Sequence, residues 1–401
     1  MKHLGDITKI NWFEVEPVDC VTGGSPCQDL SIAGKRAGLA GERSGLYMEQ
    51  IRCVKELRKA SGRTGKIRPR YMVWENVPGA FSSNGGKDFA AVLEEAVRIV
   101  EPEAPSIPAP AKWPTSGCLM GGGWSIAWRV HDAQFWGVPQ RRKRIALVCD
   151  FGGRTAPEIL FERKGLRGDT AESGTAREGN GGAAEAGFNP AVARTLTARA
   201  DGSPCADRGP NIVCSPCPHK PAVMSVAYGI GNGQVHEAMT MAQEVSQTLN
   251  TMHDKQAILY QPKSAMEENW AYREDTETYP VQNMMARRLT PLECERLQGY
   301  PDGWTDIGEW IDDNGKKHQS SDSSRYKALG NSIALPFWFW LLRRISAQYE
   351  RPATLGSLFD GIGGFPLCWE RCNGKGTALW ASEIEEFPMA VTKMRFGRKE
   401  E

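Results

Sequence analysis

Short apolar runs alternate with helix-like stretches over residues 1–150. The apolar runs at 18–25 and 71–74 have the length of buried strands. Residues 44–57 and 89–97 instead carry apolar side chains three and four positions apart, as amphipathic helices do. Strands that alternate with such helices are typical of a mostly parallel sheet with helices on both faces. We therefore predict an α/β fold.

Two later apolar runs, at about 125–130 and 144–149, predict a hairpin at the edge of this sheet. Residues 136–140 between them predict a turn, and basic residues follow directly at 141–144. Such a block, like the pair Arg287 and Arg288, can contact phosphates, but a solvated charged face would have the same composition.

The pattern weakens after Phe151. Residues 168–187 contain no large apolar side chain and predict a mobile loop. Beyond this loop, a Thr-Leu pair at 195–196 with an apolar run at 211–213 is echoed by a second pair at 248–249 with a run at 256–259. Two short β-units would explain the echo, and so would a chance match within one long domain.

Regular structure is predicted again from about residue 287. Thr290, Pro291 and Glu293 have the spacing of a capped helix start. The strongly apolar stretch 333–345 predicts a helix packed against the sheet, beside a strand at 355–359.

That last strand leads into a glycine-rich turn. Gly361, Gly363 and Gly364 allow the backbone to turn tightly and to approach a ligand closely. Glu383 lies twenty residues after Gly363, at the end of another strand-like run, where an acidic side chain can accept hydrogen bonds from a ribose. The turn predicts a nucleotide-like cofactor, but it does not distinguish a dinucleotide from S-adenosylmethionine.

Composition narrows the class of protein. The 401 residues exceed the usual size of a single core, which favours a large domain with a smaller companion. No apolar run reaches the roughly 18 residues of a membrane span, and the first residues do not resemble a signal peptide, so we expect a cytoplasmic protein without a membrane partner. Eleven scattered cysteines predict reduced thiols, and a net charge of +1 leaves a nucleic-acid partner invisible in the overall balance.

Cys27 and Glu75 are the candidate reactive pair, because each closely follows a strand-like run. A thiol is useful for catalysis where a loop at the carboxyl end of a buried strand exposes it, and an acid at the end of another strand of the same sheet could face it. We predict a nucleophile and its acid, a pairing suited to attack on an electron-poor ring.

Six ordered motifs resemble those of the DNA (cytosine-5) methyltransferases. They are GSPCQ at 24–28, ENV at 75–77, QRRKRI at 140–145, RLTPLEC at 288–294, GYPD at 299–302 and GNS at 330–332. The resemblance implies a Rossmann-like S-adenosylmethionine-dependent sheet built from residues 1–150 and 322–401. Residues 151–321 would form a smaller, mostly β or irregular target-recognition domain.

One feature departs from the family pattern. The cofactor strand and its turn normally open the chain, whereas here TLGSLFDGIGGF lies at 354–365. The chain is therefore similar to a circularly permuted member of the family. A permutation requires neighbouring ends, so we predict that the two termini are adjacent.

By this resemblance, Cys27 adds to carbon 6 of cytosine and Glu75 stabilises ring nitrogen 3. Arg144 holds the base carbonyl oxygen, and Arg142 and Gln140 support the loop. The resemblance places these residues around S-adenosylmethionine: Phe359, Asp360, Gly361, Ile362, Gly364, Glu383, Ile384, Asp6, Ile7, Pro26, Asn331 and Ser332. A positive sulfonium suits a turn that lacks Lys and Arg and contains Asp360.

The implied substrate is double-stranded DNA, with the target cytosine rotated out of the helix into the pocket. Residues 29–39 have the composition of a lid over DNA. We expect a monomer in a prokaryotic or viral host cell, with any cognate restriction nuclease acting separately. Cys214 and Cys217 have zinc-ligand spacing but lack a second tight pair, so no metal is predicted.

Three other functions remain open at this stage. A nicotinamide-dependent oxidoreductase would explain the glycine-rich turn and Glu383, but not Cys27. A non-catalytic DNA-binding relic, or one part of a split assembly, would fit the unusual motif order. A tRNA-methylating relative would share the chemistry, although the long region 151–285 favours reading of duplex DNA.

Overall fold

The computed structural model of this chain describes residues 1–25, 45–63, 65–161 and 289–397, together with five short strands between 213 and 286. Several predicted features lie outside the described residues. These are Pro26, Cys27, the lid at 29–39, the loop at 168–187, Arg287, Arg288 and the side chains of Cys214 and Cys217.

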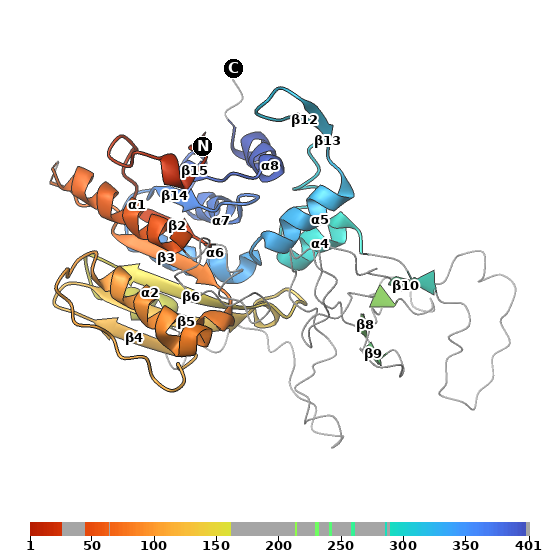
Figure 1. Cartoon of the computed structure of the whole chain (residues 1–401). Helices are drawn as coiled ribbons and strands as arrows, with labels where there is room; N and C mark the ends of the chain where they lie inside the picture. Colours follow the sequence, from red (N-terminus) through yellow and green to blue (C-terminus); the bar gives the residue numbers. More distant parts are fainter. Residues whose placement is uncertain are drawn as a thin grey trace, which may run out of the picture.

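An eight-stranded sheet forms the centre of the protein, in the order β1-β15-β14-β2-β3-β6-β5-β4 (Figure 1). Its strands are β1 (Lys2–His3), β2 (Cys20–Gly23), β3 (Tyr71–Asn76), β4 (Ser116–Met120), β5 (Ser125–Asp132), β6 (Lys143–Asp150), β14 (Leu355–Leu358) and β15 (Ala378–Ser382). The first five strands in this order run parallel, and each of the last three is antiparallel to the strand before it. The predicted α/β fold with a mostly parallel sheet is confirmed.

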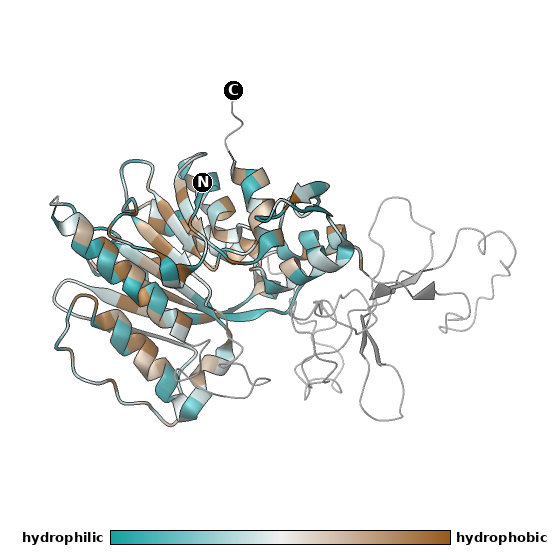
Figure 2. Cartoon of the chain, turned by 45° about the horizontal axis from the view of Figure 1, so that its top comes forward, coloured by the Kyte–Doolittle hydropathy of each residue, from teal (hydrophilic) through white to brown (hydrophobic). Residues whose placement is uncertain are grey.

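Helices cover both faces of the sheet. They are α1 (Gly45–Gly62), α2 (Lys87–Val97), α3 (Ala156–Leu160), α4 (Pro291–Gln298), α5 (Asp322–Asn331), α6 (Leu335–Ser346), α7 (Gly364–Asn373) and α8 (Glu386–Phe396). The alternation along β3 shows how the faces divide: Tyr71 and Val73 join a core with α6 and α7, whereas Met72 and Trp74 join a second core with α1 and α2. Hydrophilic residues lie on the outer sides of α1 and α2 (Figure 2).

The predicted hairpin exists, but its predicted place at the sheet edge is wrong. β5 and β6 pair antiparallel from Ser125↔Asp150 to Asp132↔Lys143. However, β6 lies between β3 and β5, and β4 forms the edge. β4 escaped prediction because its residues are alternately exposed and half-buried, without an apolar run. It pairs closely with β5, since a Cβ on Gly117 would lie 2.3 Å from the Trp128 ring.

The predicted capped helix start is confirmed at α4. The Thr290 hydroxyl accepts the Glu293 N–H, and the Glu293 carboxylate accepts the Thr290 N–H. Leu297 of α4 and Trp304 beyond it belong to the same core as α6 and α7. The division into a catalytic domain and a domain at 151–321 stays a proposal.

The start of the chain lies against the last helix. The Met1 ammonium group donates to the Phe396 carbonyl oxygen at 3.0 Å, and β1 pairs in parallel with β15 (Figure 1). The prediction that the two ends are adjacent is confirmed for these residues. The circular permutation itself stays a prediction.

Short strands account for the remaining described residues. They are β7 (Val213–Cys214), β8 (Gly229–Gly231), β9 (Thr240–Ala242), β10 (Ile258–Tyr260), β11 (Met285–Ala286), β12 (Glu309–Ile311) and β13 (Lys317–Gln319). β7 and β10, which lie at the ends of the two echoed segments, pair in parallel. None of the described helices is both long and apolar enough to cross a bilayer.

Candidate active site

The strand order reverses direction between β14 and β2. From β14 the chain continues to β15 on one side, whereas β2 and β3 lie on the other side. Ligands of open α/β sheets bind at such a switch point, at the carboxyl ends of the strands. The turn after β14 and the loop after β2 therefore face one site.

Glu75 and Arg144 meet at this end of the sheet. Glu75 lies opposite Ala146 in the β3–β6 ladder, so Arg144, two residues away on β6, projects from the same face. The Arg144 Nε atom lies 2.8 Å from Glu75 Oε1, and the two side chains are only 12% and 13% exposed. Two predicted catalytic residues, about seventy positions apart in the sequence, thus form one ion pair.

The loop after β2 runs against this carboxylate. A Cβ on Gly24 would lie 2.9 Å from Glu75 Oε2, so only glycine leaves the carboxylate in place. The buried Ser25 hydroxyl accepts the Trp74 Nε1–H at 3.0 Å. Ser25, the last described residue of this loop, therefore lies close to Glu75 and two positions before Cys27 in the sequence.

Arg142 ties the basic turn to the GNS segment. Its buried guanidinium donates to the carbonyl oxygens of Gly330 and Ser332. Its backbone N–H donates to the Asp132 carboxylate at 2.8 Å. Gln140 is fully buried, and its side-chain amide has no hydrogen-bond partner among the described residues. Asp132, which shapes the turn from the end of β5, was not predicted, although a carboxylate two residues before a turn is a usual capping position.

Glu383 organises the glycine-rich turn. Its carboxylate accepts the Gly361 N–H at 2.8 Å, and also accepts the N–H groups of Ile384 and Glu385. A carboxylate can accept about four hydrogen bonds, so capacity remains for a ribose hydroxyl. Phe359 has a φ of 53°, a left-handed conformation that is unusual for a bulky residue.

The predicted adenine side of the site is also assembled. The Ser382 hydroxyl donates to the Gly5 carbonyl oxygen at 2.6 Å, which places Asp6 and Ile7 next to Glu383. Asp6 caps its own turn by accepting the Thr8 N–H, and Ile7 is buried. Ile384 is 69% exposed, as expected of a side chain that would cover a flat ring.

Asp360 is the most unusual residue of the turn. Its side chain is buried, and Oδ1 accepts a hydrogen bond from the Ser357 hydroxyl at 2.5 Å. Oδ2 has no hydrogen-bond partner in the described part of the chain. Burial raises the pKa of this carboxyl to about 7; the Ser357 hydrogen bond opposes the shift, and the Glu383 charge adds to it.

Ile362 and Gly364 are packed against the protein core. Ile362 is fully buried in the core and its carbonyl oxygen accepts the Trp304 Nε1–H, so its side chain does not reach the predicted cofactor site. Gly364 begins α7 beneath Tyr300, whose hydroxyl oxygen would lie 2.5 Å from a Cβ there. At the GNS segment Asn331 is exposed, whereas Ser332 is buried.

Five of the described cysteines are buried: Cys20, Cys53, Cys149, Cys294 and Cys368. Burial raises the pKa of each of these thiols, which keeps them protonated and unreactive. Within the described ranges, no group of three or more candidate ligands is arranged to hold a metal ion.

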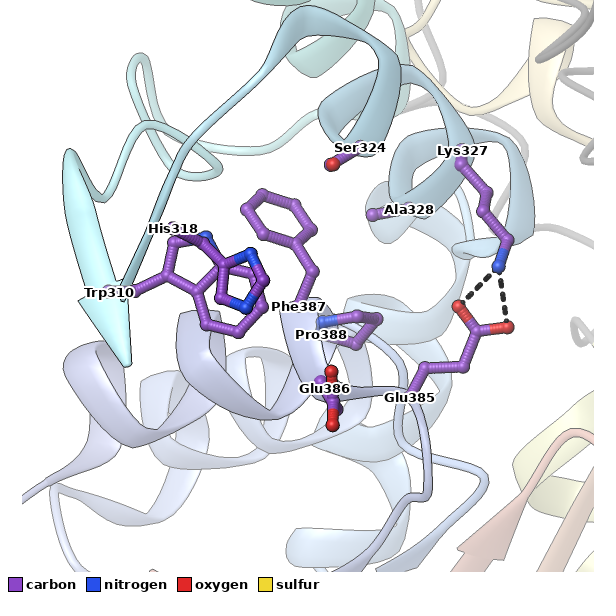
Figure 3. A pocket seen from close by; sticks show the side chains of 9 residues that line it. All are labelled: Trp310, His318, Ser324, Lys327, Ala328, Glu385, Glu386, Phe387 and Pro388. Carbon is purple, nitrogen blue, oxygen red and sulfur yellow. Dashed lines mark hydrogen bonds and ion pairs between the residues drawn. The ribbon is translucent and has the colours of Figure 1, made fainter. Parts of the chain in front are cut away.

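A cavity of about 430 Å³ opens beside the site rather than within it (Figure 3). It lies between the β12–β13 hairpin, α5 and the start of α8, and Trp310, stacked on His318, forms one wall. Lys327 pairs with Glu385 at its rim. No predicted catalytic or cofactor residue lines this cavity.

The fold and site together define a class. A doubly wound sheet, a glycine-rich turn held by an acid from the next strand, and a carboxylate–guanidinium pair across the switch point are features of an α/β enzyme with a nucleoside-containing cofactor. Comparison with known proteins then specifies the family. The family profile described as C-5 cytosine-specific DNA methylase matches residues 1–98 and 220–347, which is more than half of the chain. The chain therefore belongs to this family.

Two curated relatives and one solved structure illustrate the similarity. A protein named DNA N-6-adenine-methyltransferase, from Escherichia phage P1, is 30% identical over 86% of this chain and 55% of its own length. Type II methyltransferase M.BsuFI of Bacillus subtilis is 32% identical over 37% of this chain and 28% of its own length. The crystal structure of S. pombe Dnmt2 methyltransferase covers 86% of this chain and 83% of that one, at 15% identity and a TM-score of 0.38. The chain thus spans about half the length of the phage relative and less of the Bacillus one.

S-adenosylmethionine is the cofactor of this family. The residues of the turn fit it. A Cβ on Gly361 would meet nothing within 4 Å, so space is open over the turn. The buried Oδ2 atom of Asp360 has no hydrogen-bond partner among the described residues. Glu383 and the exposed Ile384 would hold the nucleoside, and the bound cofactor would supply a methyl group on a positively charged sulfur.

Proposed function

We propose that this chain methylates carbon 5 of a flipped-out cytosine within a short specific sequence of duplex DNA, through a covalent adduct with Cys27. The observation that carries the proposal is the pairing of Glu75 with Arg144 against the backbone of Gly24. This arrangement sets an acid and a cation at the point where the loop bearing Cys27 begins.

Carbon 5 of cytosine is a poor nucleophile until the aromatic ring is interrupted. Addition of the Cys27 thiolate to carbon 6 forms a carbon–sulfur bond and moves an electron pair toward ring nitrogen 3. Glu75 shares a proton with that nitrogen, and Arg144 holds the neighbouring carbonyl oxygen. Carbon 5 then takes the methyl group. Loss of its proton to a base and release of Cys27 restore the ring.

Positioning residues support this pair. Arg142 binds the carbonyl oxygens of Gly330 and Ser332, so it couples the basic turn to the segment that closes the cofactor site. Gln140 is buried in the same turn. We infer that both residues keep Arg144 at the height of the base, and that Asp132 serves them by accepting the Arg142 N–H.

The substrate and setting belong to the same proposal. The DNA target would be read by residues in 151–321, and the enzyme would act as a cytoplasmic monomer, with any restriction nuclease acting separately. The names of the relatives, which include type II methyltransferases and a phage protein, support the DNA substrate.

Transfer of a tritiated methyl group from S-adenosylmethionine to mixed-sequence duplex DNA tests the proposal. Transfer should occur, Cys27→Ser should abolish it, and digestion of the product to nucleosides should show 5-methylcytosine. Cys118→Ser, which removes an exposed thiol far along the sheet edge, is the matched control and should keep activity.

The identity of the labelled base also separates the alternatives. Because the phage relative is named an adenine-N6 methyltransferase, label recovered as N6-methyladenine, unaffected by Cys27→Ser, would overturn the proposal. An exocyclic amine is already nucleophilic and needs no thiolate adduct. Label transferred to tRNA in preference to duplex DNA would overturn the choice of substrate.

A further inference from the structure

Asp360 combines three features that a merely structural carboxyl does not need. It lies within the cofactor turn, between Phe359 and Gly361. Its side chain is buried, and only Oδ1 is used, by Ser357. The Oδ2 atom is enclosed and has no hydrogen-bond partner in the described chain. A buried charge without a partner is costly, so an empty site favours the protonated carboxyl.

The groups around Asp360 supply no compensating charge of their own. From β14 it receives the Ser357 hydroxyl, and its backbone N–H donates to the Ser382 carbonyl oxygen at the end of β15. Glu383 acts on it with a second negative charge. From the segment after α4, Tyr300 is buried nearby, and Arg142 behind it is already bound to carbonyl oxygens.

The cofactor and its product differ in the charge of one atom. S-adenosylmethionine carries a positive sulfonium, whereas the sulfur of S-adenosylhomocysteine is a neutral thioether. Both carry the same nucleoside and amino-acid groups. A nearby carboxyl that ionises only beside a cation would therefore favour the methyl donor over the spent product.

We propose that Asp360 discriminates between the methylated cofactor and its demethylated product by ionising when the sulfonium binds. The inference rests on the proposed function, since it assumes S-adenosylmethionine in the turn held by Glu383. It adds a specificity-determining residue whose charge changes during turnover. Transfer of the methyl group removes the sulfonium charge, after which Asp360 regains a proton and the product is released more readily.

The proton balance makes this measurable. At pH 6 the free carboxyl is mostly protonated, because burial raises its pKa to about 7. Binding of S-adenosylmethionine should then release up to about one proton per molecule. Below pH 7, the affinity for S-adenosylmethionine should therefore increase about tenfold for each unit by which the pH is raised. Binding of S-adenosylhomocysteine should release no proton through this group, so the ratio of the two affinities should rise with pH.

Isothermal titration calorimetry of the full chain with each ligand, in two buffers of different ionisation enthalpy from pH 5.5 to 7.5, counts these protons. Asp360→Asn keeps the shape and removes the charge. It should abolish the extra proton release and reduce the preference for S-adenosylmethionine about tenfold or more at pH 7.5. Ser357→Ala removes the hydrogen bond that favours ionisation, so it should move the pH profile of the preference to higher pH.

The outcomes are distinguishable. If both ligands bind wild-type protein with equal proton release, and Asp360→Asn keeps the full preference, the inference is overturned and the proposed function stands. If neither ligand binds at any pH, the cofactor site and with it the proposed function fail. Thermal unfolding of both variants checks that the protein is folded.

Discussion

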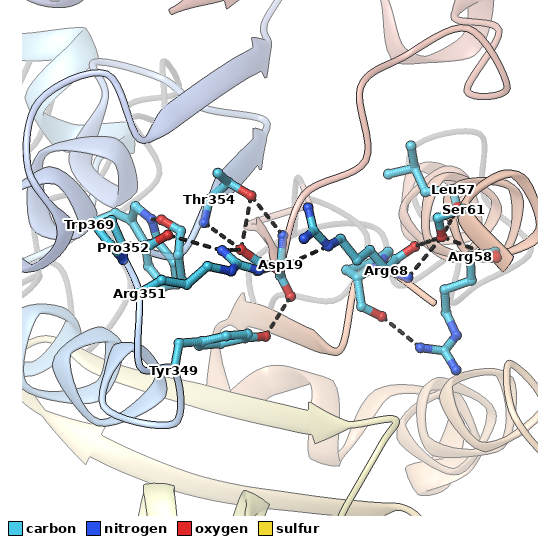
Figure 4. A network of polar contacts seen from close by, with 12 residues as sticks. Asp19, Leu57, Arg58, Ser61, Arg68, Tyr349, Arg351, Pro352, Thr354 and Trp369 are labelled. Carbon is cyan, nitrogen blue, oxygen red and sulfur yellow. Dashed lines mark hydrogen bonds and ion pairs between the residues drawn. The ribbon is translucent and has the colours of Figure 1, made fainter. Parts of the chain in front are cut away.

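The two terminal guanidinium nitrogens of Arg351 donate one hydrogen bond each to the two carboxylate oxygens of Asp19, both at 2.7 Å (Figure 4). Asp19 is 2% exposed and immediately precedes β2, whereas Arg351 lies just before β14. The same carboxylate accepts the Thr354 N–H and lies 3.4 Å from Arg68. The contact therefore fastens the amino ends of β2 and β14, whose carboxyl ends carry the two halves of the site.

Removal of this bidentate ion pair should destabilise the fold. Arg351→Met leaves the buried Asp19 carboxylate with weaker partners, and we expect a loss of about 2–3 kcal/mol in the free energy of unfolding. Urea denaturation measures it. Arg296→Met is the matched control, because Arg296 forms the same two-pronged contact with Asp302 on the exposed surface and should leave the midpoint unchanged.

The Asp19 network also predicts a pH dependence. Burial raises the pKa of Asp19, but the Arg351 hydrogen bonds, the Thr354 N–H and the charges of Arg68 and Arg351 outweigh it, so the pKa lies below its usual value. Its stabilising effect is present above pH 4 and is lost as the pH falls through the lowered pKa. In acid, the difference in stability between wild type and Arg351→Met should therefore shrink. A constant difference down to pH 2 would contradict this account.

Glu75→Gln should separate catalysis from cofactor binding. Glutamine keeps the side-chain shape but cannot deliver a proton or hold the charge of Arg144, so methyl transfer should fall at least about 100-fold. The affinity for S-adenosylmethionine, measured by calorimetry, should not change. Glu95→Gln is a suitable control, since Glu95 pairs with Arg98 at the same 2.8 Å but lies on α2. Full activity of Glu75→Gln would remove Glu75 from the mechanism.

Glu383→Ala should weaken cofactor binding more than DNA binding. The mutation removes the acceptor of the Gly361 N–H and the group expected at the ribose, so the turn loses its anchor. We expect at least a tenfold loss of affinity for S-adenosylmethionine, about 1.4 kcal/mol or more. Glu386→Ala, on the exposed start of α8, is the control. Equal calorimetric affinities of Glu383→Ala and wild type would exclude Glu383 from the site.

Gly364→Ala should be destabilising without any change of charge. The added methyl group would lie 2.5 Å from the Tyr300 hydroxyl oxygen and 2.7 Å from Ile333, so α7 or its neighbours must shift. Overpacking of this kind costs about 1–3 kcal/mol, which thermal and urea unfolding would reveal. Gly122→Ala meets nothing within 4 Å and should be nearly neutral. Equal unfolding midpoints for the two variants would show that α7 is packed less tightly than described.

Local sequence pattern was sufficient for the elements and for the residue types of the site. A continuous apolar run predicted β3, and apolar residues three and four positions apart predicted α2, because both patterns depend only on residues close together in the sequence. Thr290 and Glu293 predicted the start of α4, because a capping box joins two residues only three positions apart. The positions of Glu75 and Glu383 followed from where their strands end.

Contacts between distant residues required the folded chain. The Arg144–Glu75 pair, the burial of Ile362 and the solitary Oδ2 of Asp360 depend on which strands are neighbours, and a strand's own residues do not encode its neighbour. The half-exposed β4 likewise has too little apolar pattern to be recognised before it pairs with β5. The residue types of the site motifs are thus recognisable from short stretches of this sequence. The relative positions of those residues depend on the strand order, because hydrogen bonding and packing between strands join residues that are up to hundreds of positions apart.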